Sequence, residues 1–149
     1  MLPLRIDAVR PQDIDPLLEM VRALARHHGD AAQITRAALE RDVLGPAPWL
    51  RVLLARYDSV VGYAALVPLA QLQFGVRGMD MHHLYVVPQA RGQGVARALI
   101  DASVALAREA GCRYMTVGTH PGNAPAAAVY RAMGFDDLPP PGPRFRIRW

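Results

Sequence analysis

Residues 86–96 constrain the fold more than any other segment, because they join an apolar strand to a loop with two glycines that opens directly into a helix. The first N–H groups of a helix have no partner within it, and the helix dipole favours negative charge at that end. Gly92 and Gly94 lack a Cβ, so they can adopt a positive φ and let a bulky anion approach the main chain. The segment therefore predicts an anion site suited to a phosphate or a diphosphate.

Nucleotide-binding loops differ in their spacing, and two of them do not fit this segment. A P-loop requires a lysine directly after its last glycine, whereas the chain contains no lysine. A dinucleotide-binding fingerprint requires a third glycine near the start of a βαβ unit, whereas this loop lies late in the chain and residues 92–97 read GQGVAR. A phosphate-binding loop of another type and an ordinary strand-to-helix turn both remain open on spacing alone.

Two motifs carry a resemblance to a known family. The pattern Arg91-x-x-Gly94-x-Ala96 resembles the [Q/R]-x-x-G-x-[G/A] motif with which the GNAT superfamily of N-acetyltransferases binds the pyrophosphate of acyl-CoA. Residues 123–135, NAPAAAVYRAMGF, resemble the later N-x-x-A-x-x-x-Y-x-x-x-G-F element of the same superfamily. The resemblance runs from about residue 4 to the C-terminus. Short segments are also similar to the spermidine/spermine (diamine) acetyltransferase branch, namely 24–28, 34–35, 42–46 and 53–55.

The second motif also has local physical reasons. Asn123 is a good N-cap, Pro125 falls in the first helical turn, and Gly134 can end the helix in the left-handed conformation. Ala126 and Tyr130 are four residues apart and share one helix face, so the small residue leaves room beside the ring. A helix that begins at Asn123 is therefore predicted.

The resemblance implies acetyl-CoA as the co-substrate and assigns residues to its binding. The pantetheine arm would pair with the main chain of the strand before the loop, as an added strand does. A bulge or splay between this strand and residues 113–119 would open the slot. Binding would act mainly through backbones, so the Gln93 side chain should matter less than access at Gly94. The expected cofactor-binding residues are Leu84, Val86, Arg91, Gly92, Gln93, Gly94, Val95, Ala96, Asn123 and Tyr130.

The resemblance further implies direct attack of a primary amine on acetyl-CoA in a ternary complex. Tyr130 is the expected general acid, since a phenol with an ordinary pKa of about 10 is protonated at neutral pH and can donate to the departing thiolate. His83 is the expected general base, with His82 in reserve, because the pair occupies strand positions that hold acidic residues in the diamine branch. Neighbouring strand residues point to opposite faces, so only one of the two is expected to face the substrate.

Composition bounds the class of protein. The 149 residues suit a single domain, 1–149, and no apolar run approaches the ~20 residues that cross a bilayer. The 17 arginines outnumber the 13 acids and give a net charge of +4. They are scattered through nearly every segment and are not gathered in one stripe, so no nucleic acid partner is expected. With no signal peptide pattern and no convergent histidines for a metal, we expect a cytoplasmic enzyme without metal or membrane partner that acts on a small-molecule amine or a peptide.

Periodicity and breakers predict the order of the elements. Strands are expected over 4–9, 49–57, 60–70, 79–87, 113–119 and 144–149, and helices over 15–28, 35–44 and 92–110 and from residue 123. Asp15 is the expected N-cap of the first helix, and residues 144–149, RFRIRW, alternate as a last edge strand would. The expected fold class is α/β (α+β): a GNAT-like, mixed, mostly antiparallel twisted sheet of six to seven strands with splayed central strands and about four helices on both faces.

Two questions stay open at the level of sequence. A non-catalytic acyl-CoA-binding sensor or regulatory protein on the same fold is the alternative function, with Tyr130 as a structural residue. The acceptor amine is not identified, because the first two helices and residues 72–78 show no diagnostic spacing. A homodimer is expected from the edge strands and the alternating C-terminal segment, which could pair with a second copy.

Overall fold

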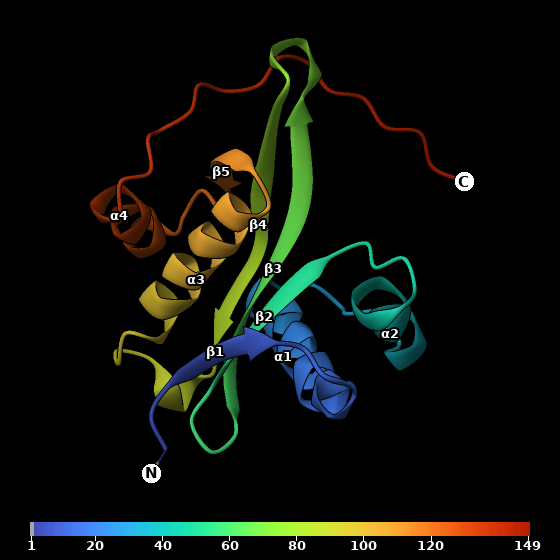
Figure 1. The fold of residues 1–149 in the computed structure, drawn as a ribbon, viewed down its shortest axis with the longest axis vertical. Coiled ribbons are helices and arrows are strands. Elements are labelled where there is room, and N and C mark those ends of the chain that lie inside the picture. Colours follow the sequence, from blue (N-terminus) through green and yellow to red (C-terminus); the bar gives the residue numbers. More distant parts are fainter. Residues whose placement is uncertain (1) are drawn as a thin grey trace. The chain divides into compact units, whose positions relative to one another are not determined.

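The computed structural model describes residues 2–149, and the chain divides after Val117 into two compact units (Figure 1). The second unit holds one helix, α4 (Ala124–Ala132). The prediction of a single domain stays a prediction. The first unit contains β1 (Arg5–Ala8), α1 (Ile14–His27), α2 (Arg36–Leu44), β2 (Arg51–Arg56), β3 (Val60–Gln71), β4 (Val76–Val86), α3 (Val95–Glu109) and β5 (Cys112–Val117), with short 3-10 turns η1 (Pro11–Asp13), η2 (Leu72–Phe74) and η3 (Pro88–Ala90).

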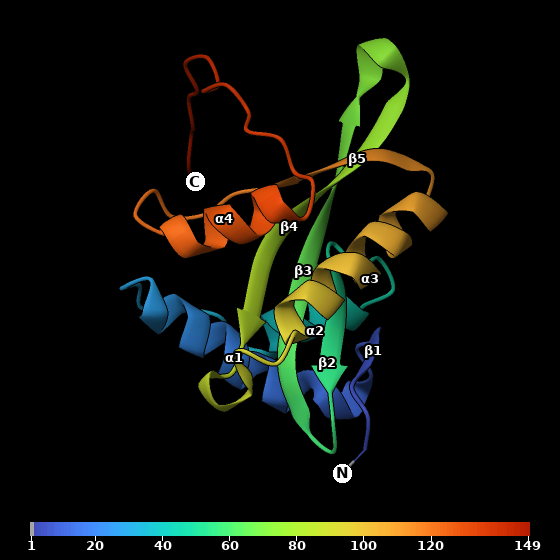
Figure 2. The same ribbon diagram turned by 90° about the vertical axis from the view of Figure 1, so that its left-hand side faces the viewer.

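The strands form one sheet in the order β1-β2-β3-β4-β5. The first four strands are antiparallel, and β5 lies parallel to β4 after the crossover through α3. β3 and β4 continue beyond the other strands as a long hairpin that pairs as far as Gln71 and Val76 (Figure 2). The mixed, mostly antiparallel fold class is confirmed, although β4 begins three residues before the predicted start of its strand.

Helices cover both faces of this sheet because β2 and β3 are apolar on both sides. Val52 and Leu54 of β2 pack with α1 and α2, whereas the residues between and after them, Leu53 and Ala55, pack with α3. This alternation is what a strand with two buried faces requires. In this unit α1 and α3 turn apolar faces to the sheet, and the periodicity of residues 92–110 predicts such a face for α3.

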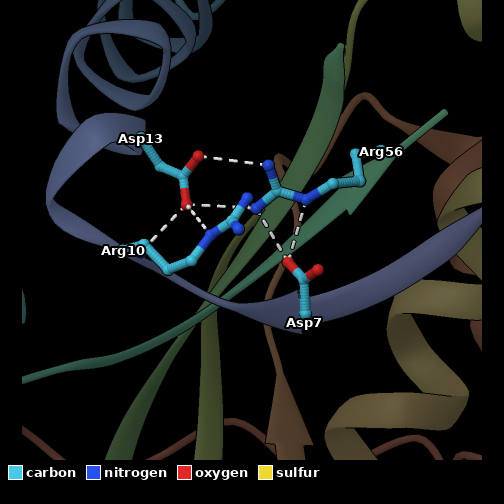
Figure 3. Close-up of polar contacts among 4 residues, drawn as sticks. All are labelled: Asp7, Arg10, Asp13 and Arg56. Carbon is cyan, nitrogen blue, oxygen red and sulfur yellow. Dashed lines mark hydrogen bonds and ion pairs between the residues drawn. The ribbon is translucent and has the colours of Figure 1, made fainter. Parts of the chain in front are cut away.

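A buried ionic network ties β1, η1 and β2 together (Figure 3). The Arg56 guanidinium is 6% exposed and donates to both carboxylate oxygens of Asp13, from Nη1 and Nη2, at 3.1 Å each. It also donates to Oδ1 of Asp7 from Nε and Nη2 at 3.0 and 2.8 Å. The Arg10 main-chain N–H donates to Asp13 Oδ2 at 2.9 Å. The network therefore fixes the start of α1 against the sheet.

The same network explains why the predicted N-cap of α1 is wrong. The helix begins at Ile14 with Asp13 as its N-cap residue, and Asp15 lies inside the first turn. Asp13 does not cap with its side chain, because its carboxylate is bound to Arg56. Asp15 instead accepts a hydrogen bond from Arg36 of α2 at 2.7 Å. The carboxylate nearest the helix start is thus taken by a partner 43 residues away in sequence.

The predicted strand over residues 144–149 is also wrong, which is why the sheet has five strands instead of six to seven. Phe145, Ile147 and Trp149 are 95%, 82% and 106% exposed. A strand needs a neighbour that shares its hydrogen bonds, and residues 118–149 contain no described strand to serve as one. The preceding prolines at 139–141 and 143 lack N–H donors and cannot extend such a ladder.

Among the described residues, no helix is long and apolar enough to cross a bilayer.

Candidate active site

The turn from β4 into α3 has the conformation that its glycines predict. Gly92 and Gly94 have φ values of 76° and 82°, the left-handed region that favours glycine. Gly94 is the N-cap residue of α3, and η3 bridges the gap back to β4. The loop therefore delivers the chain to the N-terminus of a 15-residue helix, where the dipole favours an anion.

The amides of this loop are free to bind an anion. The Arg91 N–H donates to the Pro88 carbonyl at 3.3 Å, and the first bond into the helix joins Ala98 N to the Gly94 carbonyl at 3.0 Å. Between these two, the N–H groups of residues 92–97 donate to no acceptor within the described part of the chain. Successive unpaired N–H groups at a helix start form an anion-binding cradle. The cradle begins at Gly92, since the Arg91 amide is engaged.

Two side chains hold the loop in place instead of pointing away from it. Arg91 Nε donates to the Val86 carbonyl at 2.9 Å, and its guanidinium carbon lies 5.7 Å from the centre of the Tyr85 ring. Gln93 makes two long hydrogen bonds, from Tyr57 Oη at 3.4 Å and to the Gln89 carbonyl at 3.5 Å. Arg91 thus fastens the loop to the end of β4.

The end of β4 has an open edge beside this loop. β5 pairs with β4 only over Arg77–Met81, so the last five residues of β4 have no β5 partner. The Val87 N–H donates to the Val61 carbonyl at 2.8 Å. In an antiparallel pair every second residue bonds to the neighbouring strand, so Tyr85 also turns its main-chain groups to β3. The main-chain groups of Leu84 and Val86 therefore face the open edge, where the Val86 carbonyl accepts a hydrogen bond from Arg91. An extended ligand could add to this edge as a strand.

The two strand histidines lie at a β-bulge. Ala65 is opposite His83 and Leu66 is opposite Met81, so His82 is an extra residue without a partner on β3. The His82 and His83 rings stack, with centroids 4.3 Å apart and planes 14° apart. Rings on opposite faces of a sheet could not do this, so the expectation that the pair points to opposite faces is wrong. The bulge re-aims one side chain, as bulges near active sites do.

His83 is bound by a residue that the sequence did not single out. The Tyr63 hydroxyl and His83 Nδ1 are 2.9 Å apart, and the two rings meet edge to face. Tyr63 is 1% exposed, and burial raises the pKa of its phenol well above the ordinary value. Burial, with the nearby His82 and His28 rings, lowers the pKa of His83 to about 4. Both groups are therefore neutral at pH 7. No local pattern marks Tyr63, because only the register of β3 and β4 places it beside His83.

This pKa predicts an acid-sensitive fold. His83 binds a proton with a pKa of about 4 in the folded protein and of about 6.5 in an unfolded chain. The unfolded state binds more protons between these values, so stability should fall as pH drops from about 6.5 to about 4. After a discount for partial exposure, the loss is about 2 kcal/mol. Urea unfolding of the wild type and His83→Gln at pH 7 and pH 4.5 should show a weaker pH dependence in the variant. His27→Gln, an exposed control, should retain the full dependence.

The second unit contains the other predicted site residues. Asn123 is the N-cap residue of α4, and its Oδ1 accepts a hydrogen bond from the Ala126 N–H at 3.2 Å. Tyr130 is half-buried near the end of the helix, where burial raises the pKa of its phenol. Gly134 has a φ of 94°, and the Phe135 N–H donates to the Tyr130 carbonyl at 3.0 Å. The second motif therefore forms a capped helix that presents a protonated tyrosine.

Among residues 2–149, no group of three or more histidine, cysteine, aspartate or glutamate side chains is arranged to hold a metal ion.

Comparison with known proteins agrees with these features. Residues 17–135 match the acetyltransferase (GNAT) family. The chain is 28% identical over 137 residues to a thialysine N-epsilon-acetyltransferase of Bos taurus, covering 85% of this chain and 80% of the relative. It is 32% identical over 127 residues to an aminoglycoside N(6')-acetyltransferase type 1 of Stenotrophomonas maltophilia, covering 85% and 72%.

Solved structures share the fold. An aminoglycoside N-acetyltransferase in complex with CoA aligns with a TM-score of 0.78 at 22% identity, over 98% of this chain and 95% of that one. The resemblance seen in the two sequence motifs is thus confirmed. With its mixed sheet and its match over residues 17–135, the chain belongs to the GNAT family of acetyltransferases and is an acyltransferase enzyme.

Proposed function

We propose that this enzyme transfers the acetyl group of acetyl-CoA to a primary amine of a small molecule or peptide by direct attack in a ternary complex. The observation that carries the proposal is that the free amides of residues 92–97 directly follow the open edge of β4. A diphosphate suits the amide cradle, and an extended arm with amide groups suits the main-chain groups of Leu84 and the N–H of Val86 at the open edge. Both features lie in the same unit and follow one another along the chain.

The proposed cofactor-binding residues of the first unit each have a part in this arrangement. Gly92, Gln93, Gly94, Val95 and Ala96 contribute amides of the cradle, while Arg91 holds the loop against β4. Asn123 shapes the start of α4, from which Tyr130 projects three helical positions before the C-cap. The amine of the acceptor is the nucleophile. Names of relatives that include thialysine and aminoglycosides support a small amine as the acceptor.

The reaction requires two proton transfers. Acetyl-CoA supplies an activated thioester carbonyl, so a bond forms between the amine nitrogen and that carbon while the carbon–sulfur bond breaks. The ammonium of the acceptor must lose a proton before its nitrogen can attack, and the histidine pair at the bulge, His83 with His82 in reserve, is the proposed proton acceptor. Tyr130 is the proposed donor to the departing thiolate. No covalent intermediate on the enzyme is needed.

The test is release of free thiol from acetyl-CoA by the purified protein across a panel of amines. The panel should contain thialysine, lysine, diamines, aminoglycosides and short peptides. Turnover that depends on an amine supports the transferase. If the protein binds CoA in calorimetry but no amine gives turnover, the proposal fails and the sensor alternative takes its place.

Gly94→Ala should abolish most of the affinity for CoA with only a small effect on the fold. A Cβ at Gly94 meets no protein atom within 4 Å, so the fold bears only the cost of a positive φ, about 1–2 kcal/mol. The added methyl group lies beside the amide cradle and would keep a diphosphate away. Loss of one or two charge-assisted hydrogen bonds predicts a Kd for CoA that rises about 10- to 100-fold.

Gly111→Ala is the matched control for this variant. Gly111 follows α3 with a φ of 84° and also has no protein atom within 4 Å of a built Cβ. Its backbone cost therefore equals that of Gly94→Ala, at a position away from the cradle. Calorimetry should give a wild-type Kd for Gly111→Ala. Equal losses in both variants would mean that backbone strain, not a blocked cradle, weakens binding.

A further inference from the structure

The two nitrogen atoms of His83 have different surroundings, and this difference decides its chemistry. Nδ1 lies 2.9 Å from the Tyr63 hydroxyl. In a neutral imidazole one nitrogen donates and the other accepts, so the partner of Nδ1 determines what Nε2 can offer. If the phenol donates to Nδ1, Nε2 carries the proton. If Nδ1 donates to the phenol oxygen, Nε2 has a free lone pair.

Burial decides between these two arrangements. Tyr63 is 1% exposed, and His83 Nδ1 is the hydrogen-bond partner that its hydroxyl has among the described residues. A donating Nδ1–H would leave the phenolic proton buried without an acceptor, which is costly. A donating phenol satisfies both groups with one bond. The raised pKa of Tyr63 and the lowered pKa of His83 agree with a donating phenol, because this hydrogen bond requires both groups to be neutral at pH 7.

His82 has no such restriction. It is exposed at the bulge, its ring stacks on that of His83, and no residue in the described part of the chain is hydrogen-bonded to it. A neutral imidazole always keeps one nitrogen lone pair, so His82 can accept a proton in either tautomer. The bulge therefore places a hydrogen-bonded histidine and an unrestricted histidine side by side.

We propose that Tyr63 is a positioning residue that holds His83 as the Nε2–H tautomer, so that His83 donates a hydrogen bond to an oxygen of the bound reactants and His82 accepts the proton from the amine. This assignment rests on the proposed acetyl transfer and reverses the order of the two histidines expected from the sequence. The charged or titratable groups that face His83 are Tyr63 on β3, His82 on its own strand and His28 at the end of α1, and the two histidines disfavour protonation of its ring.

The tautomer can be read without any activity. Protein labelled with ¹⁵N at histidine, at pH 7, should give a long-range imidazole spectrum in which His83 has a protonated Nε2 and an acceptor Nδ1. Tyr63→Phe should shift the Nδ1 resonance and release the second tautomer. Tyr114→Phe makes the same chemical change on β5, over Gly78, and should leave the His83 signals unchanged. A protonated Nδ1 in the wild-type protein would overturn the proposal, even if Tyr63→Phe does not fold.

Kinetics then separates the roles of the two histidines. Once an amine that the enzyme acetylates is known, His82→Gln should lower kcat by about 10²-fold and remove the acidic limb of the pH profile of kcat. His83→Gln keeps an N–H donor and should retain that limb with a smaller loss of kcat. Loss of the limb in His83→Gln alone would overturn the assignment. A wild-type protein without turnover would defeat the proposed function, while the spectrum would still decide the tautomer.

Discussion

Tyr130→Phe is expected to lower kcat for amine acetylation by about 10²- to 10⁴-fold, the range that a positioned general acid contributes, with little change in KM for acetyl-CoA. Only the hydroxyl is lost. The ring keeps its edge-on contact with Phe135 at 5.7 Å, and the bonds that end α4 are made by main-chain atoms. The variant should therefore fold like the wild type, and its defect should lie in the chemical step.

The raised pKa of Tyr130 sharpens this expectation. Burial raises the pKa of the Tyr130 phenol, so the hydroxyl keeps its proton to higher pH than an exposed tyrosine does. Thiol release and CoA calorimetry, measured on the same preparations, separate catalysis from binding. Tyr114→Phe is the matched control and should keep wild-type kcat. If Tyr130→Phe also keeps it, the hydroxyl is not the acid and the tyrosine is only a packed ring.

Features with local causes could be predicted from the sequence. Thr35 and Asn123 cap α2 and α4 through side-chain oxygens, as their residue types predict. Gly92 and Gly94 take the positive φ values that the loop needs. The periodicity of residues 92–110 predicted the apolar face of α3. Each of these features depends on residues within a few positions of one another.

Features set by cross-strand register could not be predicted in this way. His82 and His83 share a face because an extra residue enters β4 opposite Ala65 and Leu66. Nothing in residues 79–87 marks that insertion, since the pairing belongs to two strands at once. The bond of Tyr63 to His83 depends on the same register. The sequence therefore located the histidine pair but not its geometry or its partner.

The C-terminal segment shows the opposite error. Residues 144–149 have an ideal strand pattern, yet they form no strand among the described residues. A period of two gives a strand one apolar face, but it does not supply the neighbouring strand that its backbone N–H and C=O groups must bond to. The segment keeps its apolar side chains exposed, so the expectation of a homodimer through it stays a prediction.

Arg56→Ala should destabilise the fold by about 3–5 kcal/mol, the cost of removing one partner from a buried ion pair, because the Asp13 carboxylate would keep only the longer contact to Arg10 Nε at 3.4 Å among its side-chain partners in the described part of the chain. The carboxylate of Asp13 is 3% exposed and would lose the two bonds that hold its pKa below the ordinary value. Asp7 would lose two more, although it is less buried. Urea unfolding at pH 7 measures the loss, and the melting temperature should drop by about 10 °C or more.

The pH dependence of this loss of stability distinguishes an electrostatic effect on Asp13 from lost packing. In the wild type Asp13 has a lowered pKa, so its contribution is present at neutral pH and is lost as pH falls through the folded pKa. Without Arg56 the buried carboxyl should take up a proton more readily, so the deficit of Arg56→Ala should shrink towards pH 4. Arg41→Ala removes an equally bidentate but exposed pair with Asp42 and should change the stability little, because solvent screens the pair. If the deficit of Arg56→Ala does not change with pH, the lost stability comes from the aliphatic stem of Arg56 and not from the Asp13 carboxylate.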